Sequence, residues 1–230
     1  MGGVIELAPG FHAGFTERAA RNQAYGVGDA AALVDANRAE AAARFGFGAE
    51  RIAWMNQVHG ADVAVVAGPG LAGSVDAMVS TSPDVVLAAL AADCLPLVAA
   101  APAAGVIAAA HSGRAGTAAG VATAMVRSMA ALGAAPDGIV VALGPAICGS
   151  CYEVPSAMRD EVAAAVPEAA SLTRWGSTGV DMRAAVAAQL RAAGVGQVID
   201  DARCTLEDPE LFSHRRDAPT GRMAGYVWRA

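Results

Sequence analysis

The feature that most restricts the fold of this chain is a nearly continuous apolar run over residues 85–110. Asp93, Pro96, Pro102 and Gly105 interrupt the run, and much of the remainder is alanine. A membrane-spanning helix needs about 20 uninterrupted apolar residues, so these interruptions argue against a span. We therefore interpret the run as short buried strands, with hairpin chemistry at residues 102–105.

Helical and strand-like patterns alternate through the rest of the chain. Residues 30–45 predict a helix that stops at Gly46, because good helix formers are followed by a glycine. Strand-like runs occur singly and in hairpins between helices, so an α+β fold with mixed sheets fits better than a strictly parallel sheet. No linker or fixed-period repeat is visible, and we expect one domain over residues 1–230. The other expected helices are 117–132, 156–166 and 180–193, and the expected strands are 4–15, 51–58, 61–66, 75–81, 85–91, 97–101, 106–110, 139–143, 195–200 and 224–228.

Composition and charge narrow the class of protein. The 230 residues are 55% hydrophobic, which is ample for a large core. A net charge of −6 argues against nucleic acid or an anionic membrane as partner, so an anionic substrate must be met by a few local arginines. The N-terminus has neither the basic nor the apolar region of a signal peptide. We expect a cytoplasmic protein whose four cysteines are reduced.

His59, Cys94 and His111 each end a strand-like apolar run at a turn, where a mixed scaffold places its chemistry. Imidazole and thiolate are the usual zinc ligands, and three of them leave the open position of a catalytic site. The separations of 35 and 17 residues match no short metal motif. The alternative is a buried free cysteine and two unrelated loop histidines. Our hypothesis is that the three side chains converge on one metal ion.

Two polar residues beside these three are candidates for proton transfer or orientation. Asp93 precedes Cys94 and could carry a proton or orient a histidine ligand; equally, it could cap the backbone of a turn. Asn56 lies three residues before His59, and in a continuous strand it would point to the opposite face unless the chain bends at Gly60. We treat Asn56, Asp93 and Cys94 as the catalytic candidates.

For other polar residues, a functional role competes with an ordinary structural one. Cys148 and Cys151 have the spacing of a redox or metal pair, but no partner pair is visible and we favour packing. Arg215, Arg216 and Arg222 could bind phosphate or form a solvated surface.

The remaining aromatic and histidine residues carry weaker signals. Trp54 and Tyr152 could stack on a base, although core packing is the simpler role. His12 and His214 have no paired context, and we expect ordinary packing or surface positions for both.

Seven short motifs are ordered along the chain between about Phe15 and Trp228. They are residues 56–60 (Asn-Gln-Val-His-Gly), 76–79 (Asp-Ala-Met-Val), 92–96 (Ala-Asp-Cys-Leu-Pro), 110–113 (Ala-His-Ser-Gly), 144–147 (Gly-Pro-Ala-Ile), 151–154 (Cys-Tyr-Glu-Val) and 212–217 (Phe-Ser-His-Arg-Arg-Asp). Together they resemble the YfiH/YlmD family, whose members are often labelled laccase-domain proteins or polyphenol oxidases.

The resemblance implies a fold, a cofactor and an activity. It implies a layered α-β-β-α sandwich of mixed β-sheets, similar to the catalytic domain of cytotoxic necrotizing factor. It places zinc on His59, Cys94 and His111. The implied activity is purine nucleoside phosphorylase, which converts adenosine, inosine or methylthioadenosine and phosphate to free base and ribose 1-phosphate, with adenosine deaminase as a side activity. Formation of a homo-oligomer stays open.

This chain departs from the family pattern at two places. Where the family usually reads His-Ala-Gly-Trp-Arg-Gly, this chain has Arg114 in place of the tryptophan and Ala115 in place of the arginine. The loop at residues 19–28 is short and lacks the usual glycine- and serine-rich segment. We take Arg18, Arg114 and Arg216 as phosphate-binding candidates. Arg114 could replace the missing family arginine or could point to solvent from the start of the following helix.

Three other functions compete with this reading. In a cysteine hydrolase, Cys94 would be the nucleophile and His111 the base, and some relatives are described as peptidoglycan precursor editing factors. If the protein were a non-catalytic binding module, the polar residues of the pocket would be dispensable, and alanine substitution with intact folding would reveal this. A multicopper oxidase is excluded by counting, because four histidines cannot supply a blue-copper site and a trinuclear cluster.

Overall fold

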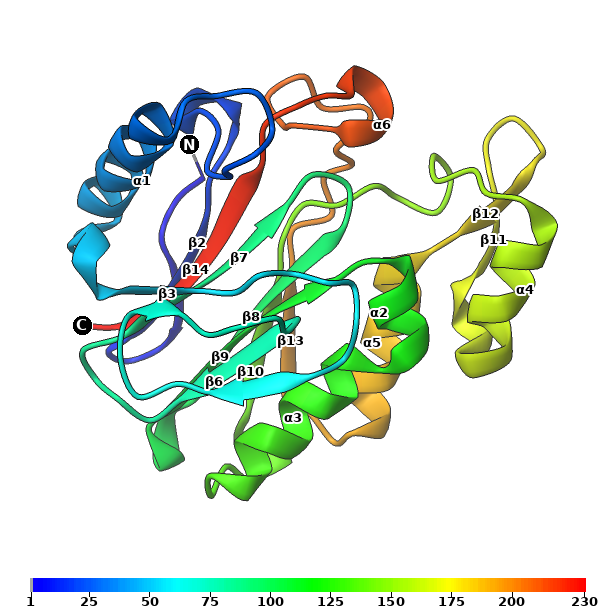
Figure 1. Cartoon of the computed structure of the whole chain (residues 1–230). Coiled ribbons are helices and arrows are strands. Elements are labelled where there is room, and N and C mark those ends of the chain that lie inside the picture. The colour runs from blue at the N-terminus through cyan, green and yellow to red at the C-terminus, as the bar shows by residue number, and fades with distance from the viewer. Residues whose placement is uncertain (1) are drawn as a thin grey trace.

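Two six-stranded mixed sheets lie face to face at the centre of the structure, a computed structural model that describes residues 2–230 (Figure 1). The first sheet has the order β1-β2-β14-β7-β3-β5 and the second β13-β10-β8-β9-β6-β4. The first comprises β1 (Ile5–Ala8), β2 (Phe11–Phe15), β14 (Met223–Arg229), β7 (Val86–Ala91), β3 (Ile52–Trp54) and β5 (Gly70–Leu71). The second comprises β13 (Gln197–Asp200), β10 (Val140–Leu143), β8 (Leu95–Ala101), β9 (Val106–Ser112), β6 (Ala77–Ser80) and β4 (Val63–Val65).

Helices cover the two outer faces. Helix α1 (Ala31–Phe45) packs on the first sheet, where the ring of Phe45 lies 5.7 Å from that of Tyr226 on β14. Helices α3 (Val121–Ala131) and α5 (Met182–Ala192) pack on the second sheet. The α-β-β-α sandwich of mixed sheets is therefore confirmed. The smaller elements are α2 (Arg114–Ala119), α4 (Ser156–Ala165), α6 (His214–Asp217) and a hairpin of β11 (Ala170–Leu172) and β12 (Thr178–Val180).

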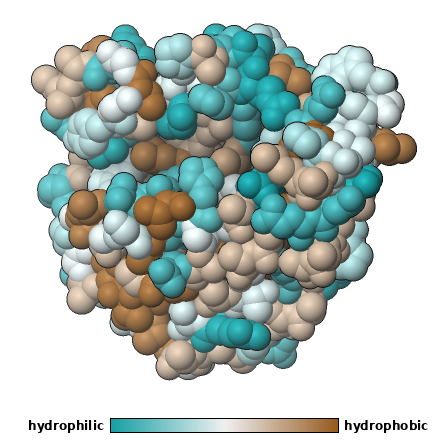
Figure 2. Space-filling view, turned by 45° about the vertical axis from the view of Figure 1, so that its right-hand side comes forward, coloured by the Kyte–Doolittle hydropathy of each residue, from teal (hydrophilic) through white to brown (hydrophobic). Residues whose placement is uncertain are grey.

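The apolar run over residues 85–110 forms β7, β8 and most of β9, as predicted. Along β8, Leu95 and Leu97 pack against α3 and α5, whereas Val98 and Ala100 face the other sheet. Successive side chains of a strand point to opposite faces, so a strand covered on both sides must be apolar at every position. Within residues 2–230, no helix is both long and apolar enough to cross a membrane. On the face shown in Figure 2, hydrophilic residues are mixed with apolar ones.

Three expected elements were longer than those observed. The expected strand 4–15 is a hairpin that turns at Gly10, whose φ is 77°. The expected helix 117–132 is two helices divided at Gly120, whose φ of 80° lies in the left-handed region that interrupts a helix. The expected strand 51–58 ends at Trp54: the Asn56 N–H still bonds to the Gly73 carbonyl, but the N–H groups of residues 58–60 bond to the Asp76 carboxylate instead of a neighbouring strand. The short strands β5, β11 and β12 were not predicted.

The chain passes between the two sheets several times at one end of the sandwich. Residues 92–94 lead from β7 in the first sheet to β8 in the second, and residues 55–62 lead from β3 to β4. Strand β9 runs antiparallel to β8, so its C-terminal residues reach the same end. Residues 55–62, residues 92–94 and the residues that follow β9 therefore meet at the same end of the sandwich.

Candidate active site

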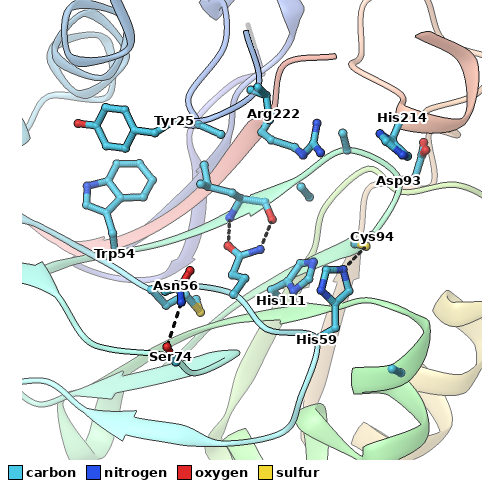
Figure 3. Close-up of a pocket in the computed structure, with 18 of the residues that line it drawn as sticks. Tyr25, Trp54, Asn56, His59, Ser74, Asp93, Cys94, His111, His214 and Arg222 are labelled. Carbon is cyan, nitrogen blue, oxygen red and sulfur yellow. Dashed lines mark hydrogen bonds between the residues drawn. The ribbon is translucent and has the colours of Figure 1, made fainter. Parts of the chain in front are cut away.

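A pocket of about 1100 Å³ opens at this end of the sandwich (Figure 3). Tyr25 and Trp54 lie at one side of it, and His59, Cys94 and His111 lie at the other. Ligand pockets in proteins typically measure about 300–1000 Å³, so this one is large enough for a nucleoside-sized molecule.

His59, Cys94 and His111 converge, as expected from the sequence. One ligand atom from each lies within 4.8 Å of the others, and Cys94 Sγ is 3.9 Å from His59 Nε2. Zinc binds sulfur at about 2.3 Å and nitrogen at about 2.0–2.1 Å, which places tetrahedral donors roughly 3.3–3.8 Å apart. The two nitrogen donors and the sulfur therefore fit zinc after a small contraction.

Strand pairing brings two of the three together. In the β8–β9 register, Pro96 is opposite His111 and Leu95 is opposite Ser112. Continuing that register places Cys94 opposite Gly113. A Cβ atom added at Gly113 would lie 2.7 Å from His59 Cδ2 and 3.1 Å from Cys94 Sγ. Only glycine leaves room for the cluster at this position.

Asp76 organises the site, and the sequence reasoning did not single it out. Its fully buried carboxylate accepts hydrogen bonds from the backbone N–H groups of Val58, His59 and Gly60 at 3.1, 3.0 and 2.6 Å. The same carboxylate lies 2.9 Å from His111 Nδ1. Asp76 therefore holds His59, whose φ is 62°, in place and leaves His111 Nε2 for a ligand. In the sequence, Asp76 is visible only as a single acidic residue at the start of an apolar strand.

The electrostatics of the metal-free cluster favour a thiolate beside an imidazolium. Burial raises the pKa of Cys94, but hydrogen bonds and charge from His111 and His59 outweigh it and bring the pKa to about 6. Burial lowers the pKa of His111, but hydrogen bonds and charge from Asp76 and Cys94 raise it to about 9. For Asp76, burial is outweighed by the hydrogen bonds from His111 and the backbone, so its pKa is lowered. At neutral pH, zinc would meet a ready thiolate and would displace a proton from His111.

Both polar catalytic candidates line the pocket. Asp93 has a φ of 84°, and its carboxylate accepts the Thr205 hydroxyl at 2.6 Å and the Arg215 N–H at 2.7 Å. Asp93 thus ties distant segments to the turn before Cys94. Asn56 is exposed and donates to Ser74 Oγ at 2.9 Å.

The side-chain amide of Gln57 pairs with the N–H and C=O of Leu90, both at 2.8 Å. This contact joins the irregular segment after β3 to β7 and fixes the wall of the pocket.

The three arginine candidates are placed differently. Arg114, the first residue of α2, lines the pocket and forms an ion pair of 3.1 Å with Glu161. Arg18 lies outside the pocket lining and pairs with Asp217 at 2.8 Å. Arg216 is also outside the lining, and its guanidinium donates to four backbone carbonyls of residues 205–211. Arg216 Nε also donates to Asp217 at 3.0 Å, so Arg18 and Arg216 share one carboxylate, whereas Arg114 alone of the three lines the pocket.

Arg215 and Arg222 also line the pocket, so two of the arginines weighed as either phosphate ligands or surface residues are at the site. Arg222 extends from the pocket wall in Figure 3. The Arg215 guanidinium lies over the Tyr152 ring at 5.2 Å. Arg114, Arg215 and Arg222 therefore all line the pocket that holds the cluster.

His214 is exposed, as expected for a surface position, and it also lines the pocket, near Asp93 in Figure 3. His12 lies outside the lining, with its ring 5.8 Å from that of Trp228. Trp54 both lines the pocket and packs on the core, and Arg38 lies 3.7 Å over its ring and 4.3 Å over that of Tyr25. Tyr25 was missed because nothing near it in sequence marks it.

Comparison with known proteins places this chain among relatives of shared fold and sequence. A protein of Streptomyces griseus named purine nucleoside phosphorylase is 52% identical over 206 residues, which cover 88% of this chain and 84% of that protein. A Streptomyces coelicolor protein of the same name is 48% identical and covers 99% of both chains. The crystal structure of YlmD from Geobacillus stearothermophilus superposes with a TM-score of 0.89 at 33% identity, covering 98% of this chain and 94% of that one.

The family profile described as multi-copper polyphenol oxidoreductase laccase matches residues 11–230. That match covers nearly all of the chain, and the structural similarity to YlmD agrees with the motifs noted in the sequence. This chain belongs to the laccase-like YfiH/YlmD family.

Proposed function

We propose that this protein is a zinc-dependent purine nucleoside phosphorylase that uses His59, Cys94 and His111 as its zinc ligands. The observation that carries the proposal is one pocket with aromatic groups at one end, a two-histidine, one-cysteine cluster at the other, and arginines in its lining. The names of relatives at 52% and 48% identity support the same activity.

The aromatic end suits a purine. Tyr25 and Trp54 enclose the Arg38 guanidinium, whose Nε donates to the Gln23 carbonyl at 2.8 Å. This layered wall is flat, partly apolar and fixed in position, so a planar base can stack on it. Exposed Asn56 and Ser74 lie beside Trp54 in Figure 3 and can hydrogen-bond to the edge of the base.

The arginine-rich end suits phosphate. Arg114 and Arg215 can each offer a planar fork of donors to phosphate oxygens. The Glu161 partner of Arg114 has an exposed side chain, so exchanging that ion pair for phosphate costs little. His214 and Asp93 lie close to this end and are candidates for holding or moving the proton that the leaving purine takes up.

The donor set determines what a bound metal can add. A zinc ion with an open position acts as a Lewis acid and lowers the pKa of water, chemistry that also suits the proposed adenosine deaminase side activity. His59, Cys94 and His111 would hold the ion, Asp76 would keep His111 in the right tautomer, and the sandwich core would exclude solvent from behind.

Phosphate dependence tests the proposal. Purified protein is incubated with inosine or adenosine with and without inorganic phosphate, and free base, ribose 1-phosphate and ammonia are measured. We expect base release only with phosphate, accompanied by an equal amount of ribose 1-phosphate. Equal rates without phosphate, or no ribose 1-phosphate, would refute a phosphorylase.

One geometric observation favours a second candidate, a cysteine hydrolase acting in peptidoglycan precursor editing. Cys94, His111 and Asp76 form a thiol–imidazole–carboxylate series in which the carboxylate orients the base. The thiolate cannot serve as both a zinc ligand and a free nucleophile. Turnover of an amino-acid-bearing muropeptide precursor that persists after zinc removal and is lost in Cys94→Ser would favour the hydrolase.

A further inference from the structure

The sequence showed no partner pair for Cys148 and Cys151, and we favoured packing for both; in the structure Cys151 and Cys204 do belong to one buried cluster, with Cys148 packed against it. Cys204 and Glu207 lie against them, and one ligand atom from each of the four residues lies within 4.8 Å of all the others. This second cluster shares no residue with the lining of the pocket. It therefore needs an explanation of its own.

Two turns of the same form build the cluster. In the first, the N–H groups of Cys151 and Tyr152 both donate to the Cys148 carbonyl at 2.9 Å. In the second, the N–H groups of Glu207 and Asp208 donate to the Cys204 carbonyl at 3.1 and 2.9 Å. Each turn thus presents its first and fourth side chains on one side, as zinc-binding Cys-x-x-Cys turns do.

The two turns are joined and held without any ion. The Cys148 N–H donates to Cys204 Sγ at 3.4 Å, and Ala146 forms a β-bridge with Cys204. The Arg216 guanidinium binds the carbonyls of Thr205, Leu206 and Asp208, which fixes the second turn. The four donors are therefore preorganised, which lowers the entropic cost of binding a ligand.

The donor chemistry points to zinc rather than to packing or a disulfide. Packing requires no polar donor, yet a carboxylate joins three sulfur atoms. A disulfide would use two sulfurs and leave the third sulfur and the carboxylate without a role. Three thiolates and one carboxylate fill a tetrahedral zinc shell completely, which is the mark of a structural site.

Arg174 neighbours this cluster and offsets its charge. Its guanidinium is 2.6 Å from Glu207 Oε1 and also contacts Cys151 Sγ. A carboxylate has two oxygens, so one can bind a metal while the other keeps the arginine. Three thiolates and a carboxylate carry two more negative charges than zinc neutralises, and a nearby guanidinium reduces that excess.

We propose that Cys148, Cys151, Cys204 and Glu207 form a second, structural zinc site. The site clamps two segments that also reach the pocket, since Tyr152 lines it and Thr205 holds Asp93. Bound zinc stabilises this junction without contacting substrate. The proposal is independent of the phosphorylase activity, and it stands whether or not phosphate proves to be a substrate.

Metal counting on variants of the first cluster tests the proposal. Cys94→Ala protein is equilibrated with zinc, dialysed and analysed for metal. We expect one zinc per chain to remain, and none in Cys94→Ala/Cys204→Ser. A Cys94→Ala chain without bound zinc would overturn the proposal, as would a disulfide between any two of Cys148, Cys151 and Cys204 found by mass spectrometry of the freshly purified protein.

An exposed ligand gives a test that does not depend on the core. In the Cys94→Ala background, Glu207→Ala should weaken zinc binding by roughly tenfold or more in a chelator competition. Glu210→Ala, another exposed carboxylate in the same loop, is the matched control and should have no effect. Cobalt should give the intense sulfur-to-metal absorption of several thiolates in Cys94→Ala protein. Equal zinc affinity in the two glutamate variants, or no such absorption, would refute the site.

Discussion

Replacing Asp76 by asparagine isolates the role of one buried carboxylate in building the candidate metal site. Its Oδ2 accepts from the N–H groups of Val58 and Gly60, and its Oδ1 accepts from the N–H of His59 and contacts His111 Nδ1. Asparagine has one oxygen, so its amide NH₂ must face two donors in either orientation. Asp76→Asn therefore leaves at least two hydrogen bonds unmade.

The magnitude follows from the charge and burial of these bonds. Hydrogen bonds to a charged group contribute about 1.5–3 kcal/mol each, so losing two lowers the free energy of unfolding by roughly 3 kcal/mol or more. For a chain of this length that corresponds to a fall in Tm of about 6–12 °C. Because the pKa of Asp76 is lowered below its ordinary value of 3.8, this stabilisation is complete at neutral pH and is lost as the solution becomes acidic.

Zinc affinity should fall as well. Loss of the group that orients a ligating histidine typically costs about 10–100-fold in metal affinity, or roughly 1.4–2.7 kcal/mol. One effect opposes this loss, because Asp76 and Cys94 together raise the pKa of His111 to about 9, and the variant would relieve part of the proton competition at neutral pH. Chelator competition at neutral pH and again above the pKa of His111 separates the two effects, and the loss should be larger at the higher pH.

The matched control for this variant is Asp62→Asn. Asp62 is exposed, and only its backbone carbonyl contacts Asp76 and Ala77. The control loses the same charge near the site but should keep both the Tm and the zinc affinity. If Asp76→Asn bound zinc within twofold of the wild type at both pH values and melted at the same temperature, our account of the site would be refuted.

Three further perturbations test the same geometry. Gly113→Ala should reduce zinc affinity by at least about tenfold, because its Cβ would lie 2.7 Å from His59 Cδ2, whereas Gly138→Ala, which meets nothing within 4 Å, should not. In metal-free protein, alkylation of Cys94, followed by peptide mass, should fall as pH drops through about 6 and be blocked by zinc; a midpoint near the ordinary 9 would contradict the shifted pKa. Arg114→Ala should raise the KM for phosphate by roughly tenfold with zinc content unchanged, and an unaltered KM would place phosphate elsewhere.

Local sequence patterns predicted most of the elements. The helix at residues 31–45 and the buried strands from residue 86 to residue 112 follow from composition and spacing alone. Errors arose where one residue changed the backbone locally, as at Gly120, or where a distant group took the hydrogen bonds, as Asp76 does beyond Trp54. Strands of two or three residues, such as β5, carry too few residues to show a pattern.

The site was predicted less evenly. His59, Cys94 and His111 were recognisable because each is a potential metal ligand at the end of an apolar run, and they do converge. Asp76 and Gly113 stand in two of the motifs, but their roles were not recognisable, since an acid beside a strand and a glycine after one have many ordinary roles. Their importance depends on what lies opposite, which no local pattern records.

The sequence by itself determined which segments are buried, which residue types end them and therefore what chemistry is available at the turns. Only the tertiary structure decided which turns meet. Pairing β8 with β9 and passing the chain between sheets at one end joined side chains that lie 35 and 17 residues apart. The same process placed Cys204 and Glu207 against a cysteine pair that looked solitary in the sequence. The physical reason is that burial and propensity depend on neighbours along the chain, whereas a metal site depends on distances across strand pairings that the whole fold selects.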